Sequence, residues 1–239
     1  MERAAFTFSL QEAGGLLYLA DEKFGGYPVN GFHEFFGGRS GLSDLTLSGA
    51  VMAMTLYQDD GYNVRILKGD PTNEELSEWT SRVSWKLNVP SGRIAVSGIC
   101  DEGLSDYMAA WEPAGDGGDY ELGVFVEVPP CQYTVTVYSY PPNDLAGGWM
   151  ALSERRVFRE AFGSSDFEKP DAYFKRTRPA ETPRAWISEG WEDANFLDFL
   201  VRLTPLEEDP VPPRFEDDGT IKWEFRKPEI CPVGIELPV

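Results

Sequence analysis

Short apolar runs separated by glycine and proline are the feature that most constrains the fold of this chain. Its 239 residues include 24 glycines and 18 prolines, which divide the sequence into many short segments. Such punctuation is typical of strands joined by turns rather than of long helices. It predicts strands at 16–19, 50–56, 63–67, 93–97, 122–128 and 133–138. We therefore predict an α+β protein of mainly antiparallel β-structure in sandwich-like units, with a few short helices.

Turn and helix signals lie between these runs. The sequences Asp59-Asp60-Gly61 and Asp217-Asp218-Gly219 each separate two extended runs, and Asp-Gly favours a hairpin turn because it tolerates positive φ. A second extended stretch is expected at 233–237, after the hairpin at 214–225.

Helical signals are few. Thr72, followed by Glu74 and Glu75, predicts a short capped helix, and 153–162 has apolar residues at helical spacing. The run 191–203 is compatible with a helix or a strand. The glycine-rich sequence at 37–41 predicts a flexible loop, because it lacks the lysine of a phosphate-binding loop.

The N-terminal part of the chain contains a faint internal echo. At an offset of 77 residues, Leu10, Gly15, Leu17 and Leu19 match Leu87, Gly92, Ile94 and Val96. At an offset of 71, Tyr62, Val64 and Ile66 match Tyr133, Val135 and Val137. Strands that follow a glycine also look alike by chance, so two interpretations stay open. In the first, the echo is a chance likeness between strands. In the second, a β-rich region at 1–140 holds two similar β-units at 1–70 and 83–140, and an irregular α+β region at 141–239 packs on it.

Composition excludes several classes of protein. With 42% hydrophobic and 13% aromatic residues, the chain is too apolar for a disordered acidic tail. It has no apolar run of about 18 residues, so we expect no membrane span. Its 40 acidic and 21 basic residues give a net charge of −19, which disfavours nucleic acid as a partner. Three widely spaced cysteines, Cys100, Cys131 and Cys231, indicate reduced thiols and a cytoplasmic location.

The charge is distributed in blocks. No lysine or arginine occurs from Ile94 to Glu154, a window that holds ten acidic residues. The next block, 155–184, has eight basic and five acidic residues, and 187–218 has ten acidic residues with two arginines. Negative charge keeps a protein dispersed in solution, and this is one interpretation. The other is an acidic recognition face that attracts and aligns a basic partner.

Aromatic residues among these acids favour the second interpretation, because interfaces combine aromatic anchors with a charged rim. The candidate contact residues are Asp101, Glu102, Asp106, Tyr107, Trp111, Glu112, Asp116 and Asp119. A second candidate patch consists of Glu189, Trp191, Glu192 and Asp193.

Catalytic and metal-binding signals are weak. His33 is the only histidine and stands in an aromatic stretch, which favours a packed side chain over a catalytic base. Asp116-Gly117-Gly118-Asp119 could offer oxygens to calcium but lacks the ligand spacing of an EF-hand, so an exposed turn is the simpler interpretation. We expect no catalytic residue, no cofactor and no bound metal.

Three stretches carry a family resemblance. The first pattern is a proline and a glycine before an apolar strand, as in Val89-Pro90-Ser91-Gly92 and the strand that follows. The second is a VPPGxYxVxVY-like sequence, formed here by 126–130 and 133–138, with Cys131 where the pattern usually has glycine. Gly14-Gly15 before the strand at 16–19 is a further match. This layout resembles the immunity proteins of bacterial polymorphic toxin systems over about a quarter of the chain. The resemblance implies a non-enzymatic inhibitor of a cognate toxin.

The predicted function is therefore a cytoplasmic immunity-type protein that occludes a basic toxin or effector. Three alternatives stay open at this point. A carboxylate-based hydrolase would need two carboxyl groups facing each other in a cleft. A small-ligand or glycan-binding β module would need a row of exposed tryptophans. A structural component of an assembly would show exposed apolar patches.

Overall fold

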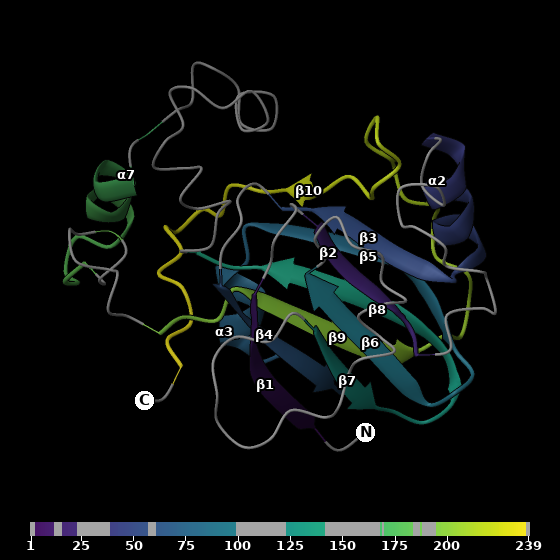
Figure 1. The fold of residues 1–239 in the computed structure, drawn as a ribbon. Helices are drawn as coiled ribbons and strands as arrows, with labels where there is room; N and C mark the ends of the chain where they lie inside the picture. Colours follow the sequence, from purple (N-terminus) through teal and green to yellow (C-terminus); the bar gives the residue numbers. More distant parts are fainter. Residues whose placement is uncertain are drawn as a thin grey trace.

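The described part of the chain is a sandwich of two β-sheets (Figure 1). The computed structural model describes residues 3–11, 16–22, 39–56, 61–98, 123–141, 168, 170–183, 187 and 195–237. The large sheet has the strand order β1 (Ala4–Gln11), β4 (Gly61–Lys68), β9 (Phe199–Pro205), β8 (Cys131–Ser139), β5 (Ser81–Val89) and β10 (Glu224–Phe225). The small sheet has the order β3 (Val51–Thr55), β2 (Leu16–Asp21), β6 (Arg93–Gly98) and β7 (Gly123–Glu127). Among the described strands, only β4 and β9 pair in parallel, so the predicted fold class is confirmed.

Alternating side chains explain why the two sheets pack face to face. Along β5, Val83, Trp85 and Leu87 are buried, and exposed or half-buried residues stand between them. Such period-two burial places one face of a strand in the core. One continuous apolar cluster joins these residues to Leu19 of β2 and Val96 of β6, and so fills the space between the sheets.

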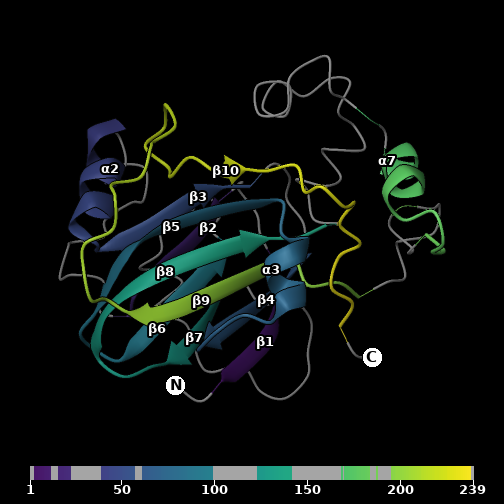
Figure 2. The same ribbon diagram turned by 180° about the vertical axis from the view of Figure 1, so that it is seen from behind.

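The outer face of the large sheet is also covered. A second apolar cluster contains Trp79, Tyr138 and Leu200, together with Ile235 and Leu237 from the C-terminal segment. Figure 2 shows helix α3 and this C-terminal segment beside β4, β8 and β9. The middle strands of the large sheet are therefore buried on both faces at this end, whereas Thr134, Thr136 and Arg202 on the outer face are only half-buried.

Three helices occur in the described residues: α2 (Arg39–Ser48), α3 (Asn73–Glu78) and α7 (Pro170–Thr177). Helix α3 begins with the predicted cap, since Thr72 accepts a hydrogen bond from the N–H of Glu75, and the Glu75 carboxylate accepts one from the N–H of Thr72. This capping box satisfies two helix N–H groups that have no partner inside the helix. It fixes the connection between β4 and β5.

Strands β1–β4 (the first half) and β5–β8 (the second half) have the same arrangement. In each half the first and last strands along the chain pair with each other in the large sheet. The second and third strands pair with each other in the small sheet. The registers also agree, because Leu10 pairs with Tyr62 in the first half and Leu87 pairs with Tyr133 in the second. The echo in the sequence falls on equivalent positions of the two halves.

An approximate two-fold relation connects the halves. In the small sheet Leu19 pairs with its own counterpart, Val96, at the centre of the β2–β6 ladder. On either side, Leu17 pairs with Gly98 and Asp21 with Ile94, and these two pairs exchange when the halves are exchanged. In the large sheet β9 lies between β4 and β8 and takes the central place. Both halves thus contribute to both sheets, while the domain limits given above stay a prediction.

The structure corrects two local predictions. The hairpin at 59–61 is wrong, because β3 belongs to the small sheet and β4 to the large one. Asp-Gly allows a tight turn, but each strand pairs where its apolar side chains are buried. The loop predicted at 37–41 is also wrong, since α2 begins at Arg39.

Other features resolve or extend the predictions. The chain reverses at 217–219 as predicted, with Gly219 at φ 91° and a bridge between Phe215 and Ile221. The ambiguous run 191–203 becomes strand β9 from Phe199. Helix α7, which starts at Pro170, carried no recognised signal although proline is common in a first helical turn. The helix predicted at 153–162 lies outside the described residues.

Candidate functional site

Both predicted contact patches lie outside the described residues. They comprise Asp101, Glu102, Asp106, Tyr107, Trp111, Glu112, Asp116 and Asp119, and then Glu189, Trp191, Glu192 and Asp193. His33 and the turn at 116–119 lie outside them as well. These assignments stay predictions, and the site has to be built from the residues that the structure places.

Internal ion pairs engage most of the described cations. Arg202 pairs with Asp70 at 2.6 Å, Lys86 with Asp209 at 2.7 Å, and Arg93 with both Glu22 and Glu127 at 2.7 and 2.8 Å. The other described cations in ion pairs are Arg3, Arg65, Arg82, Lys175, Arg176, Arg178, Lys222 and Lys227. The positive charge is thus largely neutralised within the fold, and the surplus is acidic.

Glu75 links the first half of the fold to helix α3. Its carboxylate is 3% exposed and accepts hydrogen bonds from Arg3 at 2.7 Å and Arg65 at 3.1 Å. Burial alone would raise the pKa of Glu75, but the Thr72 N–H and the two guanidinium groups outweigh it and hold this pKa below the usual value. The carboxylate is therefore ionised and serves as an anchor.

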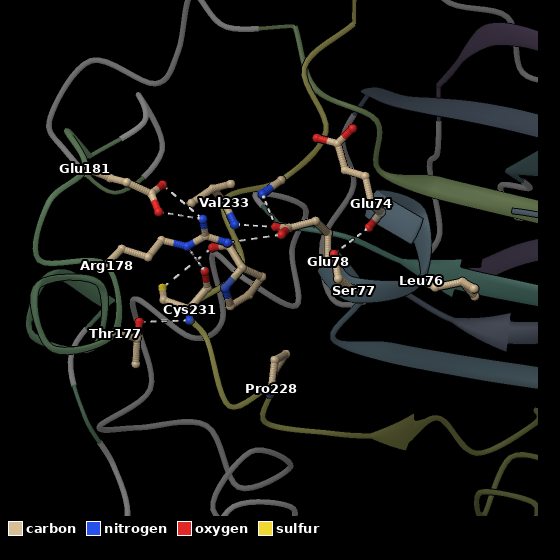
Figure 3. Close-up of polar contacts among 12 residues, drawn as sticks. Glu74, Leu76, Ser77, Glu78, Thr177, Arg178, Glu181, Pro228, Cys231 and Val233 are labelled. Atoms are coloured by element: carbon tan, nitrogen blue, oxygen red, sulfur yellow. Dashed lines mark hydrogen bonds and ion pairs between the residues drawn. The ribbon is translucent and has the colours of Figure 1, made fainter. Parts of the chain in front are cut away.

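A second buried carboxylate, Glu78, holds helix α7 and the C-terminal segment together (Figure 3). It accepts hydrogen bonds from the N–H groups of Val233 and Gly234, and Arg178 lies 3.3 Å away. Arg178 also donates to the carbonyl of Cys231 at 2.8 Å. Burial raises the pKa of Glu78 more than these donors lower it. The group resembles a catalytic cluster in composition, but every contact joins one segment of the chain to another.

Cys231 lies in this cluster and is fully buried. Burial raises the pKa of its thiol to about 12, so the thiolate is rare at neutral pH. A cysteine acts as a nucleophile only as the thiolate. Cys231 is accordingly a packing residue, as its position under Thr177 and Arg178 indicates.

The last part of the acidic block at 187–218, residues 207–218, forms a largely exposed segment. Between 207 and 218 the chain has six acidic residues and one arginine. Glu207, Glu208 and Asp209 are exposed, and Val211 beside them is 88% exposed. Next to Val211 lies a groove of about 550 Å³, lined among others by Arg82, Ser84, Pro210, Pro213 and Trp223. An exposed apolar residue with an acidic rim is suited to binding a basic protein.

A second groove, of about 280 Å³, lies between the edge strands β1 and β7. Its lining is mostly apolar and consists of Ala4, Ala5, Phe6, Ile66, Lys68, Phe125, Val126 and Glu127. Phe6 is 52% exposed, and its ring stacks on Phe8 at 5.6 Å. We did not predict this groove from the sequence. The alternation of Phe6 and Phe8 near the N-terminus is the signal from which strand β1 could have been predicted.

Among the residues that the structure describes, no group of three or more His, Cys, Asp or Glu residues could hold a metal ion. None of the helices placed in the described ranges is long and apolar enough to cross a membrane.

Comparison with known proteins gives distant likenesses only. No protein-family model and no curated protein matches the chain. A solved structure described as Crocagin biosynthetic gene J is similar at 14% identity and a TM-score of 0.41, over 86% of this chain and 99% of that chain. ComJ from Bacillus subtilis, described as an inhibitor of the DNA-degrading activity of NucA, is similar at 9% identity and a TM-score of 0.36, over 59% and 86%. At such distances the function has to be argued from the residues of this chain.

Proposed function

We propose that this chain is a cytoplasmic, non-enzymatic, immunity-type protein that binds and occludes a basic protein partner, a toxin or effector domain. One observation carries the proposal. The chain has a net charge of −19, and most of its described cations are engaged in internal ion pairs, so the accessible charge is acidic. The same surface would repel nucleic acid, since phosphate binding depends on positive charge.

The physical basis is electrostatic attraction between complementary faces. A strongly negative protein attracts a basic partner over a distance of about one Debye length, roughly 10 Å at 0.1 M salt. Enzymes that act on nucleic acids need basic clefts, and an acidic partner fits such a cleft. The described acidic segment 207–218 offers both charge and an apolar contact at Val211.

The proposal can be tested by capture followed by measurement on the purified pair. Tagged chain is incubated with lysate of its native cells and washed at about 0.1 M and then about 0.5 M salt, over which screening increases strongly. A basic protein that is bound in a one-to-one ratio is then purified, and its affinity and association rate are measured. We expect association to slow as salt rises and the partner's activity to be lost on binding.

Two charge-reversal variants locate the contact. Glu207→Lys/Glu208→Lys/Asp209→Lys changes the described acidic segment, and Asp101→Lys/Glu102→Lys/Asp106→Lys changes the first predicted patch. Asp171→Lys in helix α7 is an exposed matched control from the basic block. At least one triple variant should slow association about tenfold or more, as charge reversal at a steered interface does. Absence of any stoichiometric protein partner at either salt concentration would contradict the proposed function.

A further inference from the structure

One side of the sandwich is closed by the chain itself. Between β5 and β3, the segment at 221–225 runs along the opening: β10 pairs with β5, and the Ile221 N–H donates to the Ala53 carbonyl at 2.8 Å. The Trp223 indole donates to the Thr55 carbonyl at 2.9 Å. Ile221 and Trp223 are 1% and 5% exposed, and the Trp223 ring stacks on Phe199 at 6.2 Å. Two alternate side chains of one extended segment therefore complete the core on this side.

The opposite side is the two-fold counterpart of this closed side. The register equivalences place β1 at the position of β5 and β7 at the position of β3. The groove of about 280 Å³ lies at this counterpart, and Figure 1 shows β10 with β3 at one side and β1 with β7 at the other. Its residues Ala4, Ala5, Phe6, Phe125 and Glu127 occupy the positions of Ser81, Arg82, Val83, Ala53 and Thr55. These counterparts include all four residues of β5 and β3 to which the segment at 221–225 pairs or donates a hydrogen bond.

Among the described residues, no strand pairs with the outer edge of β1. Its sequence, Ala4–Gln11, contains no charged residue and no proline. Edge strands that avoid pairing usually carry such residues or are covered. One acceptor on this side is already satisfied, because Lys68 donates to the Glu127 carbonyl at 2.8 Å, where Trp223 donates to Thr55 on the closed side. An incoming segment therefore needs apolar side chains there and no indole donor.

We propose that an extended segment of the protein partner docks in the β1/β7 groove, pairs antiparallel with β1 and inserts two alternate apolar side chains between Phe6 and Val126. This inference rests on the proposed function, which supplies a protein partner. It specifies strand addition as the mode of recognition, in which main-chain hydrogen bonds provide affinity and side-chain pockets provide specificity.

Charge selects a foreign partner over a second copy of the chain. Two copies joined at β1 would bring together two molecules that each carry −19. Like-charge juxtaposition opposes such an assembly, and a basic partner gains from the same field. Apart from the indole of Trp223, the segment at 220–227 of this chain shows the kind of sequence that fits. Its apolar residues Ile221, Trp223 and Phe225 alternate with charged residues, and three of the four charged residues in the segment are basic.

The probe for the groove is a peptide that copies residues 220–227 with phenylalanine in place of Trp223, because Lys68 already occupies the acceptor that an indole would use. Its binding to the full chain is measured by calorimetry up to about 1 mM, a concentration that detects binding free energies of only about −4 kcal/mol. Hydrogen exchange then maps the site. We expect saturable binding and slower exchange in β1 and β7, but no change in β3 and β5. A peptide of the same composition, reordered to break the apolar alternation, should not bind.

Matched variants separate the groove from general stickiness. Phe6→Lys should weaken peptide binding by at least about tenfold, which corresponds to about 1.4 kcal/mol. Ile230→Lys removes an equally exposed apolar side chain (55% against 52%) that does not line the groove, and it should leave binding unchanged. Thermal unfolding of both variants checks that they remain folded.

Several outcomes would overturn the inference. No saturable binding, or binding that Phe6→Lys does not affect, would exclude the groove as a strand-docking site. A dimer of the chain that Phe6→Lys converts to a monomer would assign the groove to a second copy. If backbone hydrogen exchange in β1 of the free chain were as slow as in β5, the chain itself would cover the edge of β1. A basic partner found by capture together with no peptide binding leaves the proposed function standing and rejects only this inference. Peptide binding with no captured partner rejects the proposed function and its partner as the occupant, and leaves only a groove that accepts a strand.

Discussion

The two openings of the sandwich have equivalent frameworks and different contents. On one side Ile221 and Trp223 are buried between β5 and β3, whereas on the other side Phe6 remains 52% exposed between β1 and β7. The strand registers on the two sides agree residue for residue, so the difference lies in what covers the edge. In the described residues, a repeated framework is thus closed by the chain's own segment on one side and left uncovered on the other.

The largest expected effect tests the closed opening. Trp223→Ala should lower the free energy of unfolding by about 3–5 kcal/mol, because it removes a buried aromatic side chain and leaves a cavity against Phe199. Phe6→Ala, the matched change at the open side, should cost about 1 kcal/mol or less, since half of that side chain is exposed. Urea unfolding measures both. Equal costs would contradict the distinction between the two openings.

A second prediction concerns the link between the halves. Glu75→Gln should cost about 1–3 kcal/mol at neutral pH, because Arg3 and Arg65 of the first half lose their charged partner. Glu74→Gln on the exposed face of α3 is the control and should change stability by less than about 0.5 kcal/mol.

The pH dependence of the Glu75 effect has a definite sign. The pKa of Glu75 is lower in the folded protein, so its stabilisation is complete above the ordinary glutamate pKa of about 4.3 and is lost as the pH falls through the lower folded pKa. Urea unfolding of both proteins from neutral pH to about pH 2.5 should show the two stabilities converging, since wild type and Glu75→Gln then carry an uncharged group at this position. A gap that stays constant over this range would show that the charge of Glu75 is unimportant.

Gly92 provides a third test, in the turn between the first two strands of the second half. Its φ is 82°, and an added Cβ would lie 3.0 Å from the Val128 carbonyl oxygen. Gly92→Ala should therefore cost about 1–2 kcal/mol from backbone strain alone. Denaturant unfolding with an unchanged midpoint would show that this turn adjusts freely.

The smallest expected effect concerns the ion pair that joins β10 to β5. Arg82 and Glu224 form two hydrogen bonds at 2.7 and 3.2 Å, but their side chains are 40% and 62% exposed. Glu224→Ala should cost only about 0.2–1 kcal/mol, with less effect at high salt. The counterpart of Arg82 on the open side is Ala5, which offers no such pair. A cost above about 2 kcal/mol would mean that charge, rather than apolar burial, closes the β5/β3 opening.

Much of the fold was predictable because the signals are local. The alternation at 133–138 and the capping residues around Thr72 both appear as predicted. Partner choice was not predictable in the same way. The Asp-Gly sequence at 59–61 permits a hairpin, but only the burial of β3 in one sheet and β4 in the other decides against it.

The candidate site was predicted less well for the same physical reason. The β1/β7 groove is built from residues far apart in sequence, such as Phe6 and Phe125, and nothing local to either residue indicates the other. The internal echo was the one long-range signal in the sequence. The echo indicates two equivalent halves only once the pairing of Leu10 with Tyr62 and of Leu87 with Tyr133 is known, and the structure provides these registers.

The central position of β9 has a consequence for how the chain is made. Strand β9 is supplied by Phe199–Pro205, near the end of the chain, yet it lies between β4 and β8 and is the only strand that joins them. During synthesis from the N-terminus, the pair β1/β4 and the pair β5/β8 leave the ribosome before β9. Until β9 follows, the edges of β4 and β8 that it will occupy are unpaired. Unpaired strand edges are prone to aggregation, and long-range pairing is slow. Completion of the large sheet is therefore a late event, and nascent chains that end before Phe199 should depend on chaperones for solubility.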